Sequence, residues 1–312
     1  MNTLITTSVE EAASFIKKGG ITAFGTETVY GLGADILNRS AIARIFDAKR
    51  RPADNPLIAH IASLSQLKML ATEITPTAER FIKAFFPGPL TVVLKKTSAV
   101  PEIATAGLDT IGIRMPSARL ARELIEACET PLVAPSANLS GRPSPTTWQA
   151  VKEDLDGRID CILIGDPTEI GIESTVVDCT GDIPLLLRKG AVTLEQLREI
   201  VSETAEYIPR IDEAVKSPGL LHKHYSPRAK VVLIDSKDEA AADGKSAMIG
   251  IGAGGDLGML RPVENVEEYA RSLFEFFRDC DRAGIETIYC LTTADDGIGA
   301  ALMDRLYRAS KG

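Results

Sequence analysis

Three adjacent cations are the part of the sequence best suited to chemistry. Lys49, Arg50 and Arg51 stand just before Pro52, where a helical pattern of apolar residues ends. A guanidinium pairs with two oxygens of a phosphate or carboxylate, and an ammonium adds a compact charge. The cluster therefore indicates a site for an anionic ligand. The ordinary alternative is a solvated helix end, where basic residues also suit the helix dipole.

Other polar side chains occur in short motifs that fit the same interpretation. In the motif TETVYGLG, hydroxyls accompany Gly31 and Gly33, which we expect to form tight turns. Arg114 ends a predicted strand, a common way to present a charge at a sheet edge. Further groups of hydroxyl and amide side chains lie at residues 135–141 and 171–175. Each motif alone has a plain structural explanation, as a local turn, a surface charge or, for His60, a core histidine.

The composition fits a folded protein of about two domains. The chain has 312 residues, of which 45% are hydrophobic and 25% charged. No apolar run approaches the roughly 18 residues that span a bilayer, and the N-terminus lacks an export pattern, so we expect a cytoplasmic protein without membrane contact. The five cysteines form no CxxC pair and show no zinc-ligand spacing with the three histidines. We therefore expect reduced core thiols and no protein-bound metal.

The charge distribution favours a small ligand. The net charge of −8 argues against a protein that coats nucleic acid. Residues 1–228 carry 25 Lys and Arg against 28 Asp and Glu, a balance of −3, and residues 229–312 carry 10 against 15, a balance of −5. The basic side chains of the first part are therefore local clusters, which suit a small anion better than a long polyanion.

Short strands alternate with helical patterns from residue 20 to about residue 200. Strands are expected at residues 21–24, 57–61, 90–94, 110–114, 132–134, 161–164, 175–179 and 185–187. Helices are expected at residues 8–17, 41–49, 77–85, 118–126, 147–155 and 194–201. Because strands follow one another near 90–114 and 161–187, the order predicts an α/β fold with a twisted mixed sheet and flanking helices.

The alternation breaks down after residue 202, where three prolines indicate an extended linker. Beyond it, strands at 231–234, 247–251 and 287–291 and helices at 266–283 and 298–309 predict a small Rossmann-like α/β domain. The predicted division is a catalytic domain (1–205), a linker covering the active site (206–229) and a C-terminal domain (230–312). Residues 250–255 match GxGxxG, but Pro262 follows where a helix should continue, so we expect a loop and not a dinucleotide site.

Taken together and in this order, the motifs resemble the YrdC-like family, the threonylcarbamoyl-AMP synthases, and more closely their two-domain form. The matching motifs are TETVYGLG, Lys49-x-Arg51 with Asn55-Pro56-Leu57, PGPLT, IGIRMP, Ser136-x-Asn138, ESTVVD and Leu187-Arg188-Lys189-Gly190. The long form is indicated by SPG at residues 217–219 and HKHYSP at residues 222–227. One departure is Gly25, where the family usually has proline.

The resemblance implies synthesis of L-threonylcarbamoyl-adenylate and pyrophosphate from L-threonine, bicarbonate and ATP, for modification of the adenosine next to the tRNA anticodon. It also implies a downstream threonylcarbamoyl-transfer enzyme as partner and weak contact with tRNA. Mg²⁺ is expected with ATP, held mainly by phosphate oxygens and water, since no carboxylate cage is visible. Such chemistry needs several cations rather than one general base, because the reactants and the transition state are anionic.

Residue by residue, the resemblance assigns three groups of side chains. The catalytic cations are Lys49 and Arg51. The threonine pocket comprises Thr28, His60, Arg114, Ala134 and Ser174. The ATP site comprises Arg51, Asn55, Thr110, Ser136, Asn138, Ser144, Arg188 and Tyr225. We also expect the linker to cover the nucleotide as a strap, through His222, His224 and Tyr225, with a plain tether as the alternative.

Two other functions use related domains. One is an RNA-binding module without synthase activity, against which the acidic balance and the lack of an aromatic stacking signature count. The other is carbamoyl transfer in hydrogenase maturation, but the zinc-finger and acylphosphatase-like segments of that system do not occur in this sequence. A separate catalytic role for the C-terminal unit has no side-chain constellation to support it.

Overall fold

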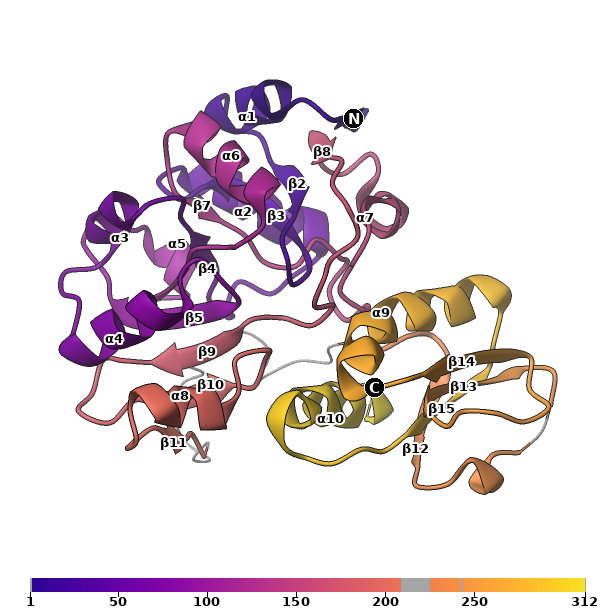
Figure 1. The fold of residues 1–312 in the computed structure, drawn as a ribbon. Coiled ribbons are helices and arrows are strands. Elements are labelled where there is room, and N and C mark those ends of the chain that lie inside the picture. The colour runs from indigo at the N-terminus through magenta and orange to yellow at the C-terminus, as the bar shows by residue number, and fades with distance from the viewer. Residues whose placement is uncertain (1, 209–224, 242, 312) are drawn as a thin grey trace.

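The computed structural model describes residues 2–208, 225–241 and 243–311, and places them in two α/β units (Figure 1). The strands of the first unit are β1 (Leu4–Thr6), β2 (Thr22–Gly25), β3 (Tyr30–Asp35), β4 (Ile58–His60), β5 (Leu90–Lys95), β6 (Thr110–Arg114), β7 (Leu132–Val133), β8 (Cys161–Leu163), β9 (Thr175–Asp178), β10 (Leu185–Arg188) and β11 (Ala205–Glu206). They form one mixed sheet in the order β1-β8-β2-β3-β7-β4-β6-β5-β9-β10-β11. The predicted mixed sheet is confirmed.

Helices flank this sheet: α1 (Val9–Lys17), α2 (Arg39–Lys49), α3 (Leu64–Leu70), α4 (Pro76–Phe85), α5 (Glu102–Thr105), α6 (Arg119–Cys128), α7 (Trp148–Leu155) and α8 (Leu194–Ile200). Helix α2 shows how local sequence positions the cation cluster. It begins at an Asn38 cap, whose side chain accepts from the Ala41 backbone N–H, and it ends at Lys49 because Arg50 adopts left-handed backbone, with φ of 51°. The chain therefore turns sharply at Arg50, and Pro52 prevents the helix from resuming.

Strand β3 corrects one prediction. Gly31 and Gly33 lie within this strand and do not form turns. A Cβ at Gly33 would lie 2.8 Å from the Phe24 ring, and one at Gly31 would lie 3.2 Å from the Ala134 Cβ. These glycines are therefore needed for the close approach of neighbouring strands and loops, while the turn itself lies between β2 and β3.

The second unit contains the strands β12 (Lys230–Ile234), β13 (Ser246–Ile251), β14 (Met259–Val263) and β15 (Thr287–Leu291), the short 3₁₀ helix η1 (Lys237–Glu239) and the helices α9 (Val266–Ala283) and α10 (Gly297–Ser310). Its sheet is parallel throughout, in the order β12-β15-β13-β14. Strand β14 was not predicted from the sequence. Pro262 is compatible with this strand because β14 lies at the edge of the sheet, where a missing N–H is tolerated.

The predicted domain limits stay a prediction. The first sheet ends with β11 at Glu206 and the second begins with β12 at Lys230. Most of the predicted linker, including His222 and His224, lies outside the described residues. Within the described ranges, no helix is both long enough and apolar enough to cross a membrane.

Candidate active site

A cavity opens where strand ends and loops of the first unit meet. It encloses about 710 Å³, with its open mouth included. Of the residues that the sequence analysis singled out, its lining contains Thr28, Arg51, His60, Arg114, Ala134, Ser136, Asn138, Ser144, Ser174, Arg188 and Tyr225. Its charged lining among the described residues consists of Arg51, Arg114, Arg142, Arg188 and a single carboxylate, Glu173. The excess of arginine suits an anionic ligand.

Arg114 is fixed by an internal counter-charge. The parallel strands β4 and β6 carry His60 and Arg114 opposite each other at their carboxyl ends. Arg114 is buried and donates from Nη1 to Thr28 Oγ1 at 2.7 Å and from Nε to the Gly88 carbonyl at 3.3 Å. Its Nη2 pairs with Glu27 Oε1 at 2.6 Å. Burial alone would raise the pKa of Glu27, but the Arg114 guanidinium holds that pKa below its usual range.

His60 lies in the same wall as a neutral ring. Burial first and the neighbouring Arg114 second lower the pKa of His60 to about 3. Its Nδ1 lies 3.3 Å from the Ile58 carbonyl oxygen, and the ring meets Phe24 edge-on at 6.3 Å between centroids. His60 therefore adds hydrogen-bonding capacity to the cavity without adding positive charge at neutral pH.

Ser174 is held between two strands. Arg188, at the end of β10, donates from Nε to the Ser174 carbonyl at 2.9 Å and from Nη2 to Ser174 Oγ at 3.0 Å. Ser174 Oγ also lies 2.8 Å from Thr91 Oγ1 on β5. A Cβ at Gly190 would lie 2.3 Å from the Thr175 nitrogen, so the turn after β10 packs directly on this segment. The geometry leaves little freedom to Ser174.

Arg51 and Asn55 retain unused hydrogen-bonding capacity. Burial lowers the pKa of Arg51 to about 10, so the side chain stays charged at neutral pH. Arg51 Nη2 donates to the Asn55 carbonyl at 3.3 Å, while its Nε has no hydrogen-bond partner among the described residues. The buried Asn55 amide also has none among them at either polar atom, although Asn55 does not line the cavity. Thr110 lines a smaller neighbouring cavity, which shares residues 56–58 with the main one.

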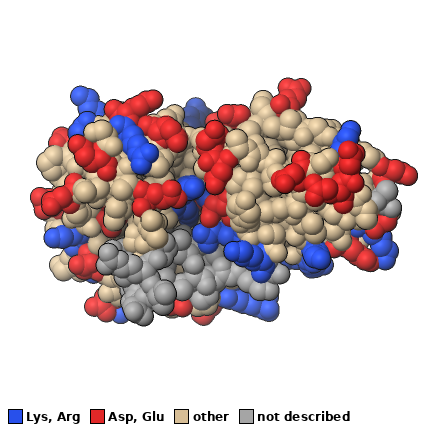
Figure 2. Space-filling model, turned by 90° about the horizontal axis from the view of Figure 1, so that it is seen from below, with Lys and Arg blue, Asp and Glu red and all other residues tan. Residues whose placement is uncertain are grey.

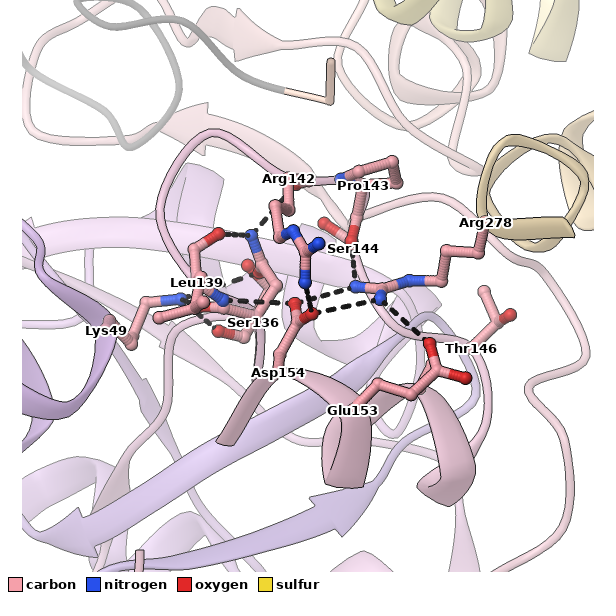
Figure 3. Close-up of polar contacts among 12 residues, drawn as sticks. Lys49, Ser136, Leu139, Arg142, Pro143, Ser144, Thr146, Glu153, Asp154 and Arg278 are labelled. Atoms are coloured by element: carbon pink, nitrogen blue, oxygen red, sulfur yellow. Dashed lines mark hydrogen bonds and ion pairs between the residues drawn. The ribbon is translucent and has the colours of Figure 1, made fainter. Parts of the chain in front are cut away.

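Lys49 lies behind the cavity wall and does not line it. Its buried ammonium donates to the carbonyl oxygens of Ser136 and Asn138, the second at 2.7 Å, and lies 3.5 Å from Asn138 Oδ1 (Figure 3). Burial lowers the pKa of Lys49, and the nearby Arg51 adds to this effect. The geometry favours a side chain that holds the loop after β7 in place; the predicted catalytic role stays a prediction.

A buried carboxylate beside this loop connects the two units. Asp154, on α7, accepts from the Leu139 backbone N–H at 3.2 Å and pairs with Arg142 at 2.5 Å. Arg278 of α9 donates to both Asp154 oxygens, at 3.2 and 2.9 Å, so that Asp154 lies between the two arginines (Figure 3). Because Arg142 lines the cavity, docking of α9 bears directly on the cavity wall.

Glu173 and Tyr225 complete the wall near the second unit. Ser144 Oγ donates to Glu173 Oε1 at 2.5 Å, and Glu173 Oε2 pairs with Arg305 Nε at 3.1 Å. Tyr225 is buried and stacks on Phe274 at 5.3 Å between centroids. Its φ of 65° is unusual for a bulky residue and costs about 1–2 kcal/mol, so the surroundings must favour this position. The predicted strap stays a prediction, with its Tyr225 end at the cavity.

The donor groups of the cavity bear on the expected Mg²⁺. Among the described residues no cluster of His, Cys, Asp and Glu could hold an ion. Glu173 lines the cavity, but its two oxygens already serve Ser144 and Arg305. The cavity's own side chains therefore match the expected Mg²⁺ only if phosphate oxygens and water supply most of its ligands.

Two carboxylates that pair with buried arginines at the site were not predicted from the sequence: Glu27 pairs with Arg114, and Glu173 pairs with Arg305. Glu27 and Glu173 lie inside the motifs TETVYGLG and ESTVVD, but the sequence alone assigned no role to either residue. One signal could have indicated them: in each motif an acidic residue stands next to hydroxyl residues in an otherwise apolar segment, and arginines elsewhere in the chain are available as partners. Arg305 and Asp154 carried no such signal, because their partners are far apart in sequence.

Sequence families cover nearly the whole chain. Residues 14–190 match the Sua5_yciO_yrdC family, described as telomere recombination, and residues 192–311 match the family described as threonylcarbamoyl-AMP synthase, C-terminal domain. The threonylcarbamoyl-AMP synthase of Pyrococcus abyssi is 46% identical over an alignment of 316 residues, gaps included. The alignment covers 96% of this chain and 93% of that protein. The threonylcarbamoyl-AMP synthase of Bacillus subtilis is 38% identical over 325 residues, with coverages of 97% and 93%.

Solved structures match the whole chain or the larger part of it. P. abyssi Sua5 complexed with L-threonine matches with a TM-score of 0.91 and 42% identity, covering 99% of this chain and 97% of that one. E. coli YciO matches with a TM-score of 0.54 and 28% identity, over 61% of this chain and 94% of its own. Fold, cavity and relatives together define an α/β enzyme of the nucleotidyltransferase class. The chain belongs to the threonylcarbamoyl-AMP synthase family, in the form that carries the C-terminal domain.

Proposed function

We propose that this enzyme converts L-threonine, bicarbonate and ATP into L-threonylcarbamoyl-adenylate, pyrophosphate and water. One observation carries the proposal: a single cavity joins the buried Arg114 and Ser174 to a second group of polar and cationic residues around Arg51 and Ser136. An amino acid and a nucleotide would thus lie side by side. The relative from P. abyssi, described as complexed with L-threonine, supports L-threonine as a ligand of this enzyme.

The amino-acid end of the cavity is the part around Arg114. We assign the threonine carboxylate to the Arg114 guanidinium, and we assign the side-chain hydroxyl and amine to Thr28, His60, Ser174 and the Ala134 backbone. The arginines and the neutral His60 disfavour another positive charge, so the bound amino group loses its proton more readily than in water. The neutral amine is the form that forms a new C–N bond with the carbon of bicarbonate, with loss of water.

The nucleotide end is the part around Arg51. Attack of a carbamate oxygen on the α-phosphorus of ATP forms the adenylate and releases pyrophosphate, with charge developing on the phosphoryl oxygens. Arg51, Arg188, Asn55, Ser136, Asn138, Ser144 and Tyr225 are our candidates for binding ATP, and Thr110 stays a candidate from the neighbouring cavity. A Mg²⁺ ion bound with ATP would neutralise part of the phosphate charge. Because carbamates decompose in water, a cavity that holds both reactants side by side favours product over hydrolysis.

The product would be used to modify the adenosine next to the tRNA anticodon, by a downstream threonylcarbamoyl-transfer enzyme. We place the enzyme in the cytoplasm, where ATP and tRNA meet. On the face drawn in Figure 2, acidic side chains are scattered among uncharged ones, and a group of Lys and Arg lies near the junction of the units. This mixed charge suits at most weak contact with tRNA and argues against a module that only binds RNA.

The test is threonine-dependent release of pyrophosphate from ATP in bicarbonate buffer. Serine, which lacks one methyl group, is the matched control and should react with a kcat/KM at least ~10-fold lower. Omission of bicarbonate should abolish the threonine-dependent rate. Equal rates with and without threonine would contradict the proposal, and tRNA binding without any pyrophosphate release would favour the RNA-binding alternative.

A further inference from the structure

Arg305 of α10 extends from the second unit to the cavity wall. Its side chain is fully buried, and its Nε lies 3.1 Å from Glu173 Oε2. The guanidinium also lies over the Tyr225 ring, 5.5 Å from its centroid, and Nη1 pairs with Asp304 at 3.0 Å. Two cavity-lining residues are therefore held by one side chain that does not line the cavity itself.

The segment that carries Glu173 also packs on the second unit through its backbone. A Cβ at Gly171 would lie 2.4 Å from the Arg271 Cα, so this segment and α9 are in direct contact. Ile172, Val29 and Tyr225 belong to the same buried apolar cluster as Phe274 and other core residues of the second unit. The core of the C-terminal unit thus continues into the wall of the cavity, and Figure 1 shows α9 and α10 on the side of that unit that faces the first.

We propose that Arg305 is a positioning residue of the synthase site, through which the C-terminal unit fixes Glu173 and Tyr225 in the cavity wall. Glu173 in turn accepts from Ser144, and its neighbour Ser174 is bound by Arg188. Arg305 therefore affects the nucleotide end of the site, through Ser144 and Tyr225, and the amino-acid end, through Ser174, although it does not line the cavity. The C-terminal domain, for which the sequence offers no catalytic constellation, is on this view a structural part of the active site.

The ionised state of Glu173 provides a specific readout. The charged and titratable groups that act on it are Arg305 from α10, Arg188 from β10, and Tyr225. Asp304 of α10 pairs in turn with Arg305. Burial alone would raise the pKa of Glu173, while Arg305 and then Arg188 hold it below the usual range. Without Arg305, the pKa of Glu173 should rise, because burial is then opposed mainly by Arg188 and by the hydrogen bond from Ser144.

The experiment compares Arg305→Met with Arg282→Met. Arg282 is the matched control, because it also pairs across the units, with Glu153 at 2.8 Å, but does not line the main cavity. At pH 7, the rate of threonine-dependent pyrophosphate release should fall at least ~10-fold in Arg305→Met, because a small displacement of site residues can lower a rate by up to about 100-fold. The rate of Arg282→Met should stay within ~3-fold of the wild-type rate. The ratio of Arg305→Met to wild-type activity should rise with increasing pH, because a raised pKa of Glu173 leaves more of this carboxyl protonated in the variant at lower pH.

Two further variants separate positioning from folding. Arg305→Lys keeps the charge and should recover part of the lost rate, whereas Glu173→Gln should lose activity with no added pH dependence. A thermal melt of each variant shows whether it is folded. The inference rests on the proposed function. Wild-type protein without threonine-dependent activity would refute that function. In that case, the affinity of Arg305→Met and of Arg282→Met for L-threonine would be compared by calorimetry. Equal behaviour of these two variants, in activity and in threonine binding, or a pH-independent loss in Arg305→Met, would overturn the role of Arg305.

Discussion

Replacing Arg114 with methionine should separate the ligand-binding role of this residue from its structural role. The guanidinium and its partner Glu27 are both nearly buried, with side-chain exposures of 4% and 3%, so solvent screening is small. Removing one member of such a pair costs about 3–5 kcal/mol of folding free energy, because the other charge stays buried. Loss of the charge-assisted bond to the threonine carboxylate should add at least ~2 kcal/mol to the transition-state free energy, or about 30-fold in kcat/KM for threonine.

The pH dependence of stability follows from the pKa of Glu27. In the wild type this pKa is lowered, so the stability contributed by the pair is present above the unfolded carboxyl pKa and is lost as pH falls through the folded value. In Arg114→Met, burial should raise the pKa of Glu27 instead. The difference in unfolding free energy between the two proteins should therefore be largest near pH 7 to 8 and should narrow toward pH 4.

Urea unfolding and steady-state kinetics on four proteins test this reasoning: wild type, Arg114→Met, Glu27→Gln and the double variant. The double variant removes both charges and should regain most of the stability, because a neutral buried pair is often as stable as an ionic one. It should not regain activity with threonine. A double variant no more stable than Arg114→Met would refute the electrostatic argument, and normal threonine kinetics in Arg114→Met would refute the assignment of the carboxylate.

Three other predictions concern single positions. Arg51→Ala should cost at least ~2 kcal/mol of transition-state stabilisation, seen as a loss of kcat/KM for ATP of about 30-fold; kinetics within ~3-fold of wild type would contradict its role. The His60 ring, with a pKa lowered to about 3, should show no titration between pH 5 and 8 by NMR, assigned by comparison with His60→Asn. Gly190→Ala should destabilise the fold by at least ~2 kcal/mol and lower activity, because the added Cβ meets the backbone at Thr175; an unchanged melting temperature would show that this contact relaxes easily.

The sequence predicted the parts of the fold whose apolar pattern repeats regularly. The bounds of β6, β15 and α9 agree with the predicted ones, because each has a clear period of apolar residues. The ends of β6 and α9 are also marked, by Arg114 and by Gly284. Strand β3 was missed because YGLG lacks the β-branched residues that mark strands. Its glycines are required by the Phe24 ring and the Ala134 Cβ, which only the folded arrangement brings near.

The same limit applies to the site. The motifs predicted most of the polar residues that line the cavity. Within one short segment, residue types at fixed spacing indicate which side chains can bind a ligand. The motifs did not indicate that Lys49 lies behind the wall or that Thr110 lies beside the main cavity. Those outcomes depend on which way a helix end or a strand start faces once the sheet has formed, and short-range pattern does not carry this information.

The missed carboxylates follow from a general electrostatic requirement. Four arginines around one cavity repel one another, and burial adds a desolvation cost to each. A fold can hold them only if internal acids balance part of the charge, as Glu27 does for Arg114 and as Glu173 does between Arg188 and Arg305. Each acid also limits how far its arginine can move, so the same contact that makes the cavity stable also sets its geometry. A search for ligand-binding cations should therefore be paired with a search for the buried acids that make them tolerable, and here that second search leads from Glu173 directly to the C-terminal domain.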